Sequence, residues 1–356
     1  MIFDESNVSL HSADVTQELS INFSIGGKKV VMPAGQIYQL RKPQNYYRDT
    51  SEENLYSVIS EIKEGTDWRK VVKRKFAHSQ PWLHDIITSP KRTKFIDEFL
   101  KPNKLSVLDI GAGWGQFSIP LAKCNRVCAI EPTPERLDFI SAISEQENVL
   151  NNMFFLGADY LAIEFKKKFD LILSIGVLEW VGSFVDSLSP EHAQIEFLKK
   201  TKSELSENGK LVIGIENRLG LKYLMGARDD HHGFKDVMIY GKEFAKNFFG
   251  ENYIDSRKCL IHSLADYEEL LNAAGFERTK FFVSVPDYKI IEKIFPISDK
   301  GSPFNDFLLQ DNWIIEHDGI DGTPLPNQEK LKHLYKSLAK MNIAHLFAPS
   351  FFIEAS

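Results

Sequence analysis

Cysteine is scarce in this sequence, and its few copies are poorly spaced for cross-linking or metal binding. The 356 residues include three cysteines, Cys124, Cys128 and Cys259. An odd and sparse set does not form a disulfide framework. Cys124 and Cys128 do not form a CxxC motif, and no second Cys or His pair lies nearby to complete a zinc site. We expect these two residues to pack as small side chains near a strand.

Long apolar runs and an excess of positive charge are also missing. No run approaches the roughly 18 apolar residues that a membrane span needs, and residues 1–5 are acidic, unlike a signal segment. The formal net charge of -6 excludes the basic footprint of broad nucleic-acid binding. We therefore expect a cytoplasmic protein with no nucleic-acid partner and no transmembrane segment. Peripheral attachment to a membrane stays open.

From residue 105 onward, short apolar runs alternate with helical spacing. Alternation of this kind predicts an α/β fold with a doubly wound parallel sheet. Right-handed crossovers bring the carboxyl ends of the strands to one edge, where ligands bind. We expect Gly209 to close the helix before the fifth strand. The predicted strands are 107–110, 126–130, 153–156, 169–175 and 210–215, and the predicted helices are 117–122, 134–146 and 193–205.

The segments on either side of this repeat differ from it. Residues 1–100 are predicted as an accessory region, with a hairpin around Gly26-Gly27 and helices over 51–64, 68–76 and 90–100. The main domain is predicted over 101–356, interrupted by insertions at 217–262 and 286–349. Residues 286–326 are rich in Pro, Gly and Asp and are expected to be irregular. Helices at 264–274 and 328–341 and strands at 277–285 and 350–355 complete the prediction.

The segment VLDIGAGWGQF, residues 107–117, contains the most informative motif. Its glycines, Gly111, Gly113 and Gly115, permit a sharp turn and close approach of the backbone to a ligand. The helix that follows directs free N–H groups toward that ligand. Glu131 ends the next strand, where a carboxylate can accept hydrogen bonds from both hydroxyls of a ribose.

This turn resembles that of class I S-adenosylmethionine-dependent methyltransferases. Nicotinamide dinucleotides favour GxGxxG, whereas the spacing here is GxGxG with Asp109 two positions before the first glycine. Three further segments match the family in order, GADYL at 157–161, FDLILSIGVLEWV at 169–181 and GKLVIGIEN at 209–217. The resemblance implies a Rossmann-like methyltransferase sheet with an N-terminal accessory region and insertions after strands 5 and 6.

The resemblance also implies the cofactor and its contacts. S-adenosylmethionine would be the methyl donor and S-adenosylhomocysteine the product. Tyr46 and Tyr47 are candidates for a lid over the methionine end, with ordinary packing as the alternative. The residues expected at the cofactor from matching positions are Asp109, Gly111, Gly113, Gln116, Glu131, Pro132, Asp159, Tyr160 and Ile175.

A second motif, GARDDHHG at 226–233, places two carboxylates beside two imidazoles. With the segment before it and PDYK at 286–289, it resembles a methyltransferase subgroup associated with bacterial surface-polysaccharide synthesis. That resemblance implies a sugar or glycan acceptor and glycosyltransferases of the same pathway as partners. Arg228 and His232 depart from the subgroup pattern, which puts the exact acceptor in doubt.

Methylation of a sugar hydroxyl benefits from a general base, which contributes about 10²–10⁴-fold. Our hypothesis assigns this role to His231, oriented by Asp230 or Asp229, because imidazole has a suitable pKa and a carboxylate fixes its tautomer. The alternative is a polar loop whose histidine caps a helix or packs against Trp180 or Tyr223. A metal site is a third reading, which we do not adopt because adjacent residues rarely all face one ion and a divalent site would need more acids from elsewhere in the chain.

Other polar and aromatic residues near the strand ends are candidates for acceptor binding. A tryptophan offers a flat face for a sugar ring, and an arginine fork suits an oxyanion. Core packing and attachment of the insertion to the sheet are the alternatives. Methylation of a small metabolite, a phosphate or a protein, and a non-catalytic scaffold, remain rival functions. The candidate acceptor residues are Glu179, Trp180, Glu216, Asn217, Arg218 and Tyr223.

Overall fold

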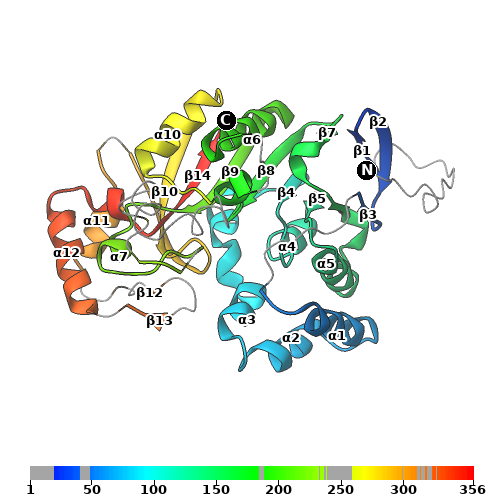
Figure 1. Cartoon of the computed structure of the whole chain (residues 1–356), viewed down its shortest axis with the longest axis horizontal. Coiled ribbons are helices and arrows are strands. Elements are labelled where there is room, and N and C mark those ends of the chain that lie inside the picture. Colours follow the sequence, from blue (N-terminus) through cyan, green and yellow to red (C-terminus); the bar gives the residue numbers. More distant parts are fainter. Residues whose placement is uncertain are drawn as a thin grey trace.

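A nine-stranded sheet forms the centre of the molecule, with helices on both sides (Figure 1). Its strand order is β11-β10-β14-β9-β8-β4-β5-β6-β3. The computed structural model describes residues 20–40, 49–183, 188–231, 233–235, 238, 259–298, 300–310, 313, 317–318, 323–325 and 327–356.

The central strands run parallel, so their carboxyl ends meet at one edge of the sheet, as predicted. β3 adds a parallel strand at one side, whereas β14, β10 and β11 are antiparallel additions at the other. The strand bounds are β3 (Ile37–Gln39), β4 (Ser106–Ile110), β5 (Arg126–Ile130), β6 (Met153–Gly157), β8 (Phe169–Ile175), β9 (Leu205–Glu216), β10 (Thr279–Pro286), β11 (Ile291–Pro296) and β14 (Ser350–Ala355).

Both faces of this sheet are covered, which explains the continuous apolar runs in its strands. Leu108 and Ile110 of β4 pack into one hydrophobic cluster, and Val107 packs into the other. Alternate residues of a strand point to opposite faces, so one short run supplies both cores. Each fully buried side chain of this size contributes about 1.5–3 kcal/mol.

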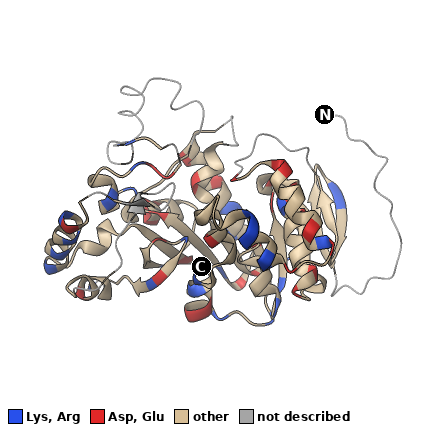
Figure 2. Cartoon of the chain, turned by 90° about the horizontal axis from the view of Figure 1, so that it is seen from below, with Lys and Arg blue, Asp and Glu red and all other residues tan. Residues whose placement is uncertain are grey.

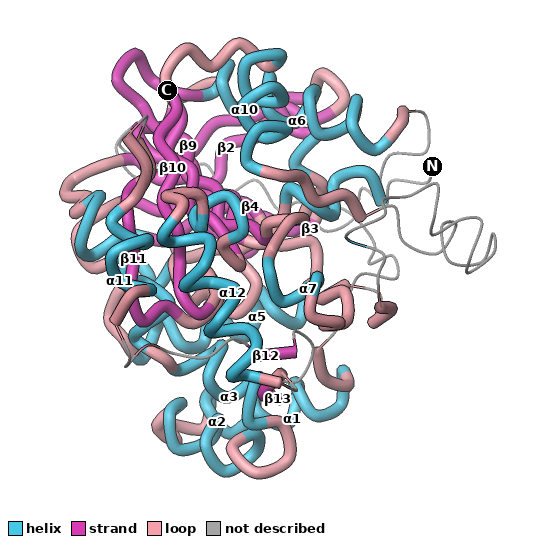
Figure 3. Tube along the Cα trace, turned by 90° about the vertical axis from the view of Figure 1, so that its left-hand side faces the viewer, coloured by secondary structure: helices cyan, strands magenta, loops and turns pink. Residues whose placement is uncertain are grey.

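The helices form layers on the two faces, and α1, α2 and α3 lie together beyond α5 (Figures 1 and 3). The predicted accessory helices are joined to the main domain, because the Gln146 side chain of α5 donates to Ile62 O (3.0 Å) and Thr66 O (2.8 Å). The bounds are α1 (Glu52–Lys63), α2 (Trp68–Phe76), α3 (Pro81–Thr88), α4 (Ser118–Ala122), α5 (Pro134–Gln146), α6 (Pro190–Glu204), α7 (Leu221–Leu224), α10 (Leu264–Ala273), α11 (Pro303–Leu308) and α12 (Gln328–Lys340).

The predicted N-terminal hairpin is confirmed. β1 (Ser20–Ile25) pairs with β2 (Lys28–Pro33) around Gly26 and Gly27, whose φ angles are 54° and 80°. β7 (Ile163–Phe165) extends this small sheet through an antiparallel pairing with β1 that the sequence did not predict.

Two helix predictions are wrong in detail. Residues 90–100 form a 3₁₀ turn and a π-helical turn rather than one α-helix. Gly209 does not close α6, which ends at Glu204, but lies within β9 at an irregularity in its pairing with β8. A side chain at Gly209 would place its Cβ 2.8 Å from Phe169 O, so the close approach of the strands explains the glycine.

The predicted insertions lie between β9 and α10 and between β10 and β14. The second contains α12, which confirms the helix predicted over 328–341, and also β11 and α11, which lie in the stretch 286–326 that was predicted as irregular. Short elements between Pro, Gly and Asp residues carry too little periodicity to be recognised from sequence. Figure 2 shows Lys and Arg interspersed with Asp and Glu over the elements. In the ranges given above, no helix is long and apolar enough to cross a bilayer.

Candidate active site

The glycine turn directly follows β4 at the carboxyl edge of the sheet. Gly111, Gly113 and Gly115 have φ angles of 71°, 58° and 76°, a region that side chains disfavour. A Cβ on Gly111 would lie 2.5 Å from Val177 Cγ2. The turn is fixed to β5 because the amides of Gly111 and Ala112 donate to Ile130 O at 2.8 and 2.9 Å.

Asp109 lies beneath this turn, where its carboxylate accepts a hydrogen bond of 2.5 Å from Ser118 Oγ. Burial raises the pKa of Asp109 to about 7, with Glu131 adding to the rise and Ser118 and Arg92 opposing it. The contact joins the end of β4 to α4, so Asp109 stabilises the turn from below.

Glu131 connects the turn to the end of β5. Its Oε2 accepts from Gly113 N (2.9 Å) and its Oε1 accepts from Thr133 N (3.0 Å). Each carboxylate oxygen has two lone pairs, so both can still accept from a ligand. Arg136 Nη1 lies 3.9 Å from Oε1 and contributes positive charge beside it.

A cavity of about 190 Å³ opens beside the turn. Asp159 lies in its wall, held by a hydrogen bond of 3.0 Å from Leu161 N to Oδ1. Tyr160 also contributes to the wall, but its hydroxyl donates to Glu204 at 2.6 Å. The predicted residues in the wall are Gly111, Glu131, Pro132, Asp159, Tyr160 and Trp180.

Some predicted cofactor residues lie outside this wall. Gln116 accepts from Trp114 N at 3.1 Å, and Ile175 packs in the core. Tyr46 and Tyr47 fall outside the described residues, so the lid stays a prediction. Asp109 and Gly113 support the turn rather than the wall.

The residues present fit a nucleoside. Apolar side chains from β5, the 3₁₀ helix η7 (Leu178–Ser183) and α6 line the cavity, and Glu131 and Asp159 supply acceptors at separate points. Thr133 Oγ1 is buried beside Glu131 and has no hydrogen-bond partner in the described structure. A buried hydroxyl without a partner is costly, and a polar ligand group satisfies it.

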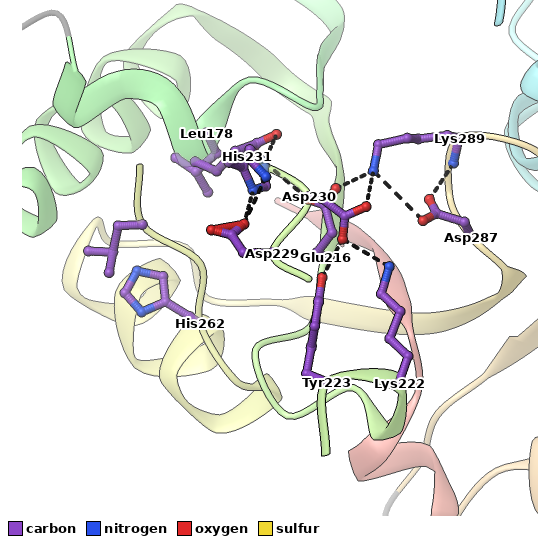
Figure 4. Close-up of polar contacts among 12 residues, drawn as sticks. Leu178, Glu216, Lys222, Tyr223, Asp229, Asp230, His231, His262, Asp287 and Lys289 are labelled. Carbon is purple, nitrogen blue, oxygen red and sulfur yellow. Dashed lines mark hydrogen bonds and ion pairs between the residues drawn. The ribbon is translucent and has the colours of Figure 1, made fainter. Parts of the chain in front are cut away.

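A second group of polar residues surrounds His231, Asp230 and Glu216 (Figure 4). Asp229 Oδ1 contacts His231 Nδ1 at 3.1 Å and accepts from His231 N at 2.8 Å. The indole of Trp180 lies edge-on to the imidazole, with ring centroids 5.0 Å apart. Because Trp180 also lines the cavity, it connects the two sites.

The other nitrogen of His231 faces two acids. Nε2 lies 3.7 Å from Glu179 Oε1 and 3.9 Å from Glu216 Oε2. Burial opposes a charge on the ring, but Cys259, Glu216 and Asp229 outweigh it and raise the pKa of His231 well above its usual value. Burial likewise raises the pKa of Glu216, although Lys289 and His231 oppose that rise.

Asp230 does not orient His231 as the sequence hypothesis allowed. Its Oδ2 accepts from Lys222 Nζ (2.9 Å) and Tyr223 OH (2.6 Å), and both side chains point toward it in Figure 4. Asp229 makes the contact with His231 instead. One peptide unit separates the two acids, and the tight turn directs their side chains to different partners.

Lys289 joins this group from the segment after β10. Its ammonium contacts Glu216 Oε1 and lies 3.7 Å from both Asp230 Oδ1 and Asp287 Oδ2. The sequence singled out PDYK without assigning these contacts. The pairing of β10 with β14, and of β14 with β9, brings Lys289 to Glu216.

Two acceptor candidates serve the scaffold. Asn217 Nδ2 donates to Leu346 O (2.9 Å) and Ala348 O (2.8 Å), which attaches the end of β9 to the segment before β14. Arg218 lies 3.8 Å from Asp266 at the start of α10. The structure places neither side chain in the cavity wall.

Parts of this chain are similar to known proteins. The methyltransferase domain family matches residues 107–190. A ubiquinone biosynthesis O-methyltransferase of Rickettsia akari is 27% identical over 40% of this chain and 55% of its own length. A tRNA 5-carboxymethoxyuridine methyltransferase of Escherichia coli K12 is 36% identical over 23% of this chain and 32% of its own. A SAM-dependent methyltransferase structure from Archaeoglobus fulgidus is 16% identical, covers 81% of this chain and 99% of its own, and has a TM-score of 0.41.

The sheet and the glycine turn define a Rossmann-like α/β protein of the methyltransferase type. With the family match over residues 107–190, they identify a class I S-adenosylmethionine-dependent methyltransferase domain in this chain. S-adenosylmethionine is the cofactor of that domain. The chain spans only about half, or less, of the two curated relatives described above.

Proposed function

We propose that this protein is an O-methyltransferase that acts on a sugar hydroxyl of a bacterial surface glycan or its precursor. The observation that carries the proposal is the buried group of Glu179, Glu216 and His231, which Trp180 connects to the cofactor cavity. Such a group suits a hydroxyl acceptor, because its carboxylates accept hydrogen bonds and its imidazole donates or accepts one.

The cavity residues have separate parts in binding the donor. Glu131 would accept from the ribose hydroxyls, and Asp159 would accept from the adenine amino group. Gly111 lets the backbone pass close to the ligand. When bound, S-adenosylmethionine supplies an activated methyl group on its sulfonium.

The acceptor side must orient a hydroxyl and exclude water. His231 presents Nε2 while Asp229 holds Nδ1, and Trp180 shields the same position. Methyl transfer requires the acceptor hydroxyl to lose its proton, and neutral His231 would accept that proton on Nε2 as the general base. Because the pKa of His231 is raised, the neutral ring becomes more populated as pH rises, so transfer should increase with pH.

The glycan part of the proposal has its own support. Residues 216–233 and PDYK resemble the polysaccharide-associated subgroup, and these same segments supply Glu216, Asp229, His231 and Lys289. The family match ends at residue 190, before both segments.

The test is transfer of labelled methyl from S-adenosylmethionine into fractionated bacterial extract. Wild-type protein should label the lipid-linked or polysaccharide fraction, and His231→Ala should abolish transfer while S-adenosylhomocysteine affinity stays within about threefold. His333→Ala is the matched control, because His333 is exposed on α12, far along the chain from the site.

Other outcomes would replace parts of the proposal. Label confined to small metabolites or to protein would keep the methyltransferase and discard the glycan. Full activity of His231→Ala would remove that residue from the acceptor site. Failure to bind S-adenosylhomocysteine in calorimetry would favour a non-catalytic scaffold.

A further inference from the structure

Three side chains able to bind a metal meet at the carboxyl edge of the sheet. Glu179 comes from the 3₁₀ helix η7 (Leu178–Ser183), Glu216 ends β9, and His231 lies in the loop after α7. One donor atom of each lies within 4.8 Å of the others. Atoms at these separations surround a point about 2–2.5 Å from each, the usual range of metal–oxygen and metal–nitrogen bonds.

Two unsatisfied atoms point to a missing ligand independently of this spacing. Oε2 of Glu179 and Oε2 of Glu216 are buried and accept no hydrogen bond from the part of the chain that the structure describes. The two side chains are 1% and 0% exposed. Buried carboxylate oxygens normally accept hydrogen bonds or coordinate metals, so both atoms call for a cation or a donor.

The neighbouring lysines do not satisfy these two carboxylate oxygens. Lys222 is engaged by Asp230, and Lys289 is engaged by Glu216 Oε1 and by Asp287. Neither lysine hydrogen-bonds to Oε2 of Glu179 or Oε2 of Glu216, the two unsatisfied oxygens.

The neighbouring contacts also orient the donors. Asp229 contacts His231 Nδ1 at 3.1 Å, and Nε2 faces the two glutamates at 3.7 and 3.9 Å, with Cys259 hydrogen-bonded to the same imidazole. A carboxylate behind an imidazole is the usual outer support of a metal-bound histidine. Lys289 occupies Oε1 of Glu216 and leaves Oε2 available.

We propose that Glu179, Glu216 and His231 bind one divalent cation. A mixed carboxylate and imidazole set suits Mn²⁺ or Zn²⁺ better than a purely oxygen-binding ion. The sequence analysis assigned no metal ligands, because nothing in the sequence showed which acids from elsewhere would meet the GARDDHHG segment. Two of the three ligands come from other segments of the chain.

The cation would hold oxygens of the acceptor, and this second part rests on the proposed function. In the metal-loaded protein, His231 is a ligand, and the acceptor oxygen contacts the ion in place of Nε2. Three protein ligands leave coordination positions open for it.

The experiment uses the full chain, stripped with EDTA and titrated with Mn²⁺ alone. Calorimetry should show one ion bound, and Glu179→Gln and Glu216→Gln should weaken binding by about tenfold or more. Pulsed electron paramagnetic resonance should show coupling to an imidazole nitrogen that His231→Ala removes. Glu204→Gln is the matched control, because Glu204 is a buried glutamate of α6 that contacts Tyr160. S-adenosylhomocysteine binding in each variant shows that the fold is intact.

The outcomes separate this inference from the proposed function. No Mn²⁺ binding at about millimolar concentration, in stripped protein that binds S-adenosylhomocysteine, would overturn the metal site. Equal Mn²⁺ affinity in Glu216→Gln and wild type would also overturn it. Mn²⁺ binding without methyl transfer to any sugar acceptor would keep the ion and reject the glycan. EDTA-resistant transfer with normal Mn²⁺ binding would reject the role of the ion at the acceptor.

Discussion

At the scale of single residues, Asp109 makes stability depend on pH. Its pKa rises from 3.8 in the unfolded chain to about 7 in the fold, so the unfolded chain binds fewer protons between these values. Stability therefore falls as pH rises from about 4 to 7. Asp109→Asn cannot ionise and should lose this dependence, with a difference of at most about 4 kcal/mol at pH 8.

Urea denaturation of both proteins at pH 5, 7 and 8 measures this effect. The stability of the wild type should drop relative to Asp109→Asn across that range. Parallel pH profiles for the two proteins would show that Asp109 is not buried as an acid.

A second prediction concerns Gly111, where a side chain would clash with its neighbours. Gly111→Ala places a Cβ 2.5 Å from Val177 and imposes a positive φ of 71° on a side chain. We expect a loss of at least about 1–2 kcal/mol in stability and about tenfold in S-adenosylhomocysteine affinity. The control is Gly65→Ala, which has a φ of 95° and no atom within 4 Å. If both variants lost the same affinity, the loss could not be attributed to the close approach at Gly111, and the prediction would be wrong.

At the scale of elements, α7 and the loop after it depend on one buried ion pair. Lys222 and Asp230 have side chains only 2% and 4% exposed. Lys222→Met leaves the carboxylate of Asp230 without its closest cation, which costs about 3–5 kcal/mol when a buried pair is broken. The double variant with Asp230→Asn should recover part of that loss in thermal denaturation. A double variant no more stable than Lys222→Met would show that the pair is not the source of the loss.

The elements also show what the sequence could and could not predict. The sequence predicted strands such as β4 and β8 and the turn with Gly111, because apolar runs and glycine spacing can be recognised within a few adjacent residues. The acceptor cluster was not, because Lys289 and Glu216 lie 73 residues apart and meet only through the insertion of β14. The sequence did flag Glu179, Glu216 and His231 separately. It gave no sign that Asp229 rather than Asp230 would turn toward the imidazole.

At the scale of the whole molecule, strand β14 holds the antiparallel end of the sheet to its parallel part. β14 lies between β9 and β10, and Phe351, Phe352 and Ile353 are fully buried. A chain ending at residue 349 should lose its cooperative thermal transition and its S-adenosylhomocysteine binding, because two long strand edges are left unpaired. Full-length protein prepared in parallel is the control. Cooperative melting of the shortened chain would show that β9 and β10 can pair without β14.

Because β14 pairs with β9 but is synthesised much later, its position also affects how the chain folds during translation. The edge of β9 is synthesised well before its neighbour, and on the order of ten seconds passes while residues 217–349 are added. During that interval the nascent chain exposes the unpaired edge of β9, the apolar strand that ends in Glu216. Chaperone contact should therefore concentrate on the interval before residues 350–355 are synthesised, when the donor side of the sheet has its strands and the acceptor side still lacks β14.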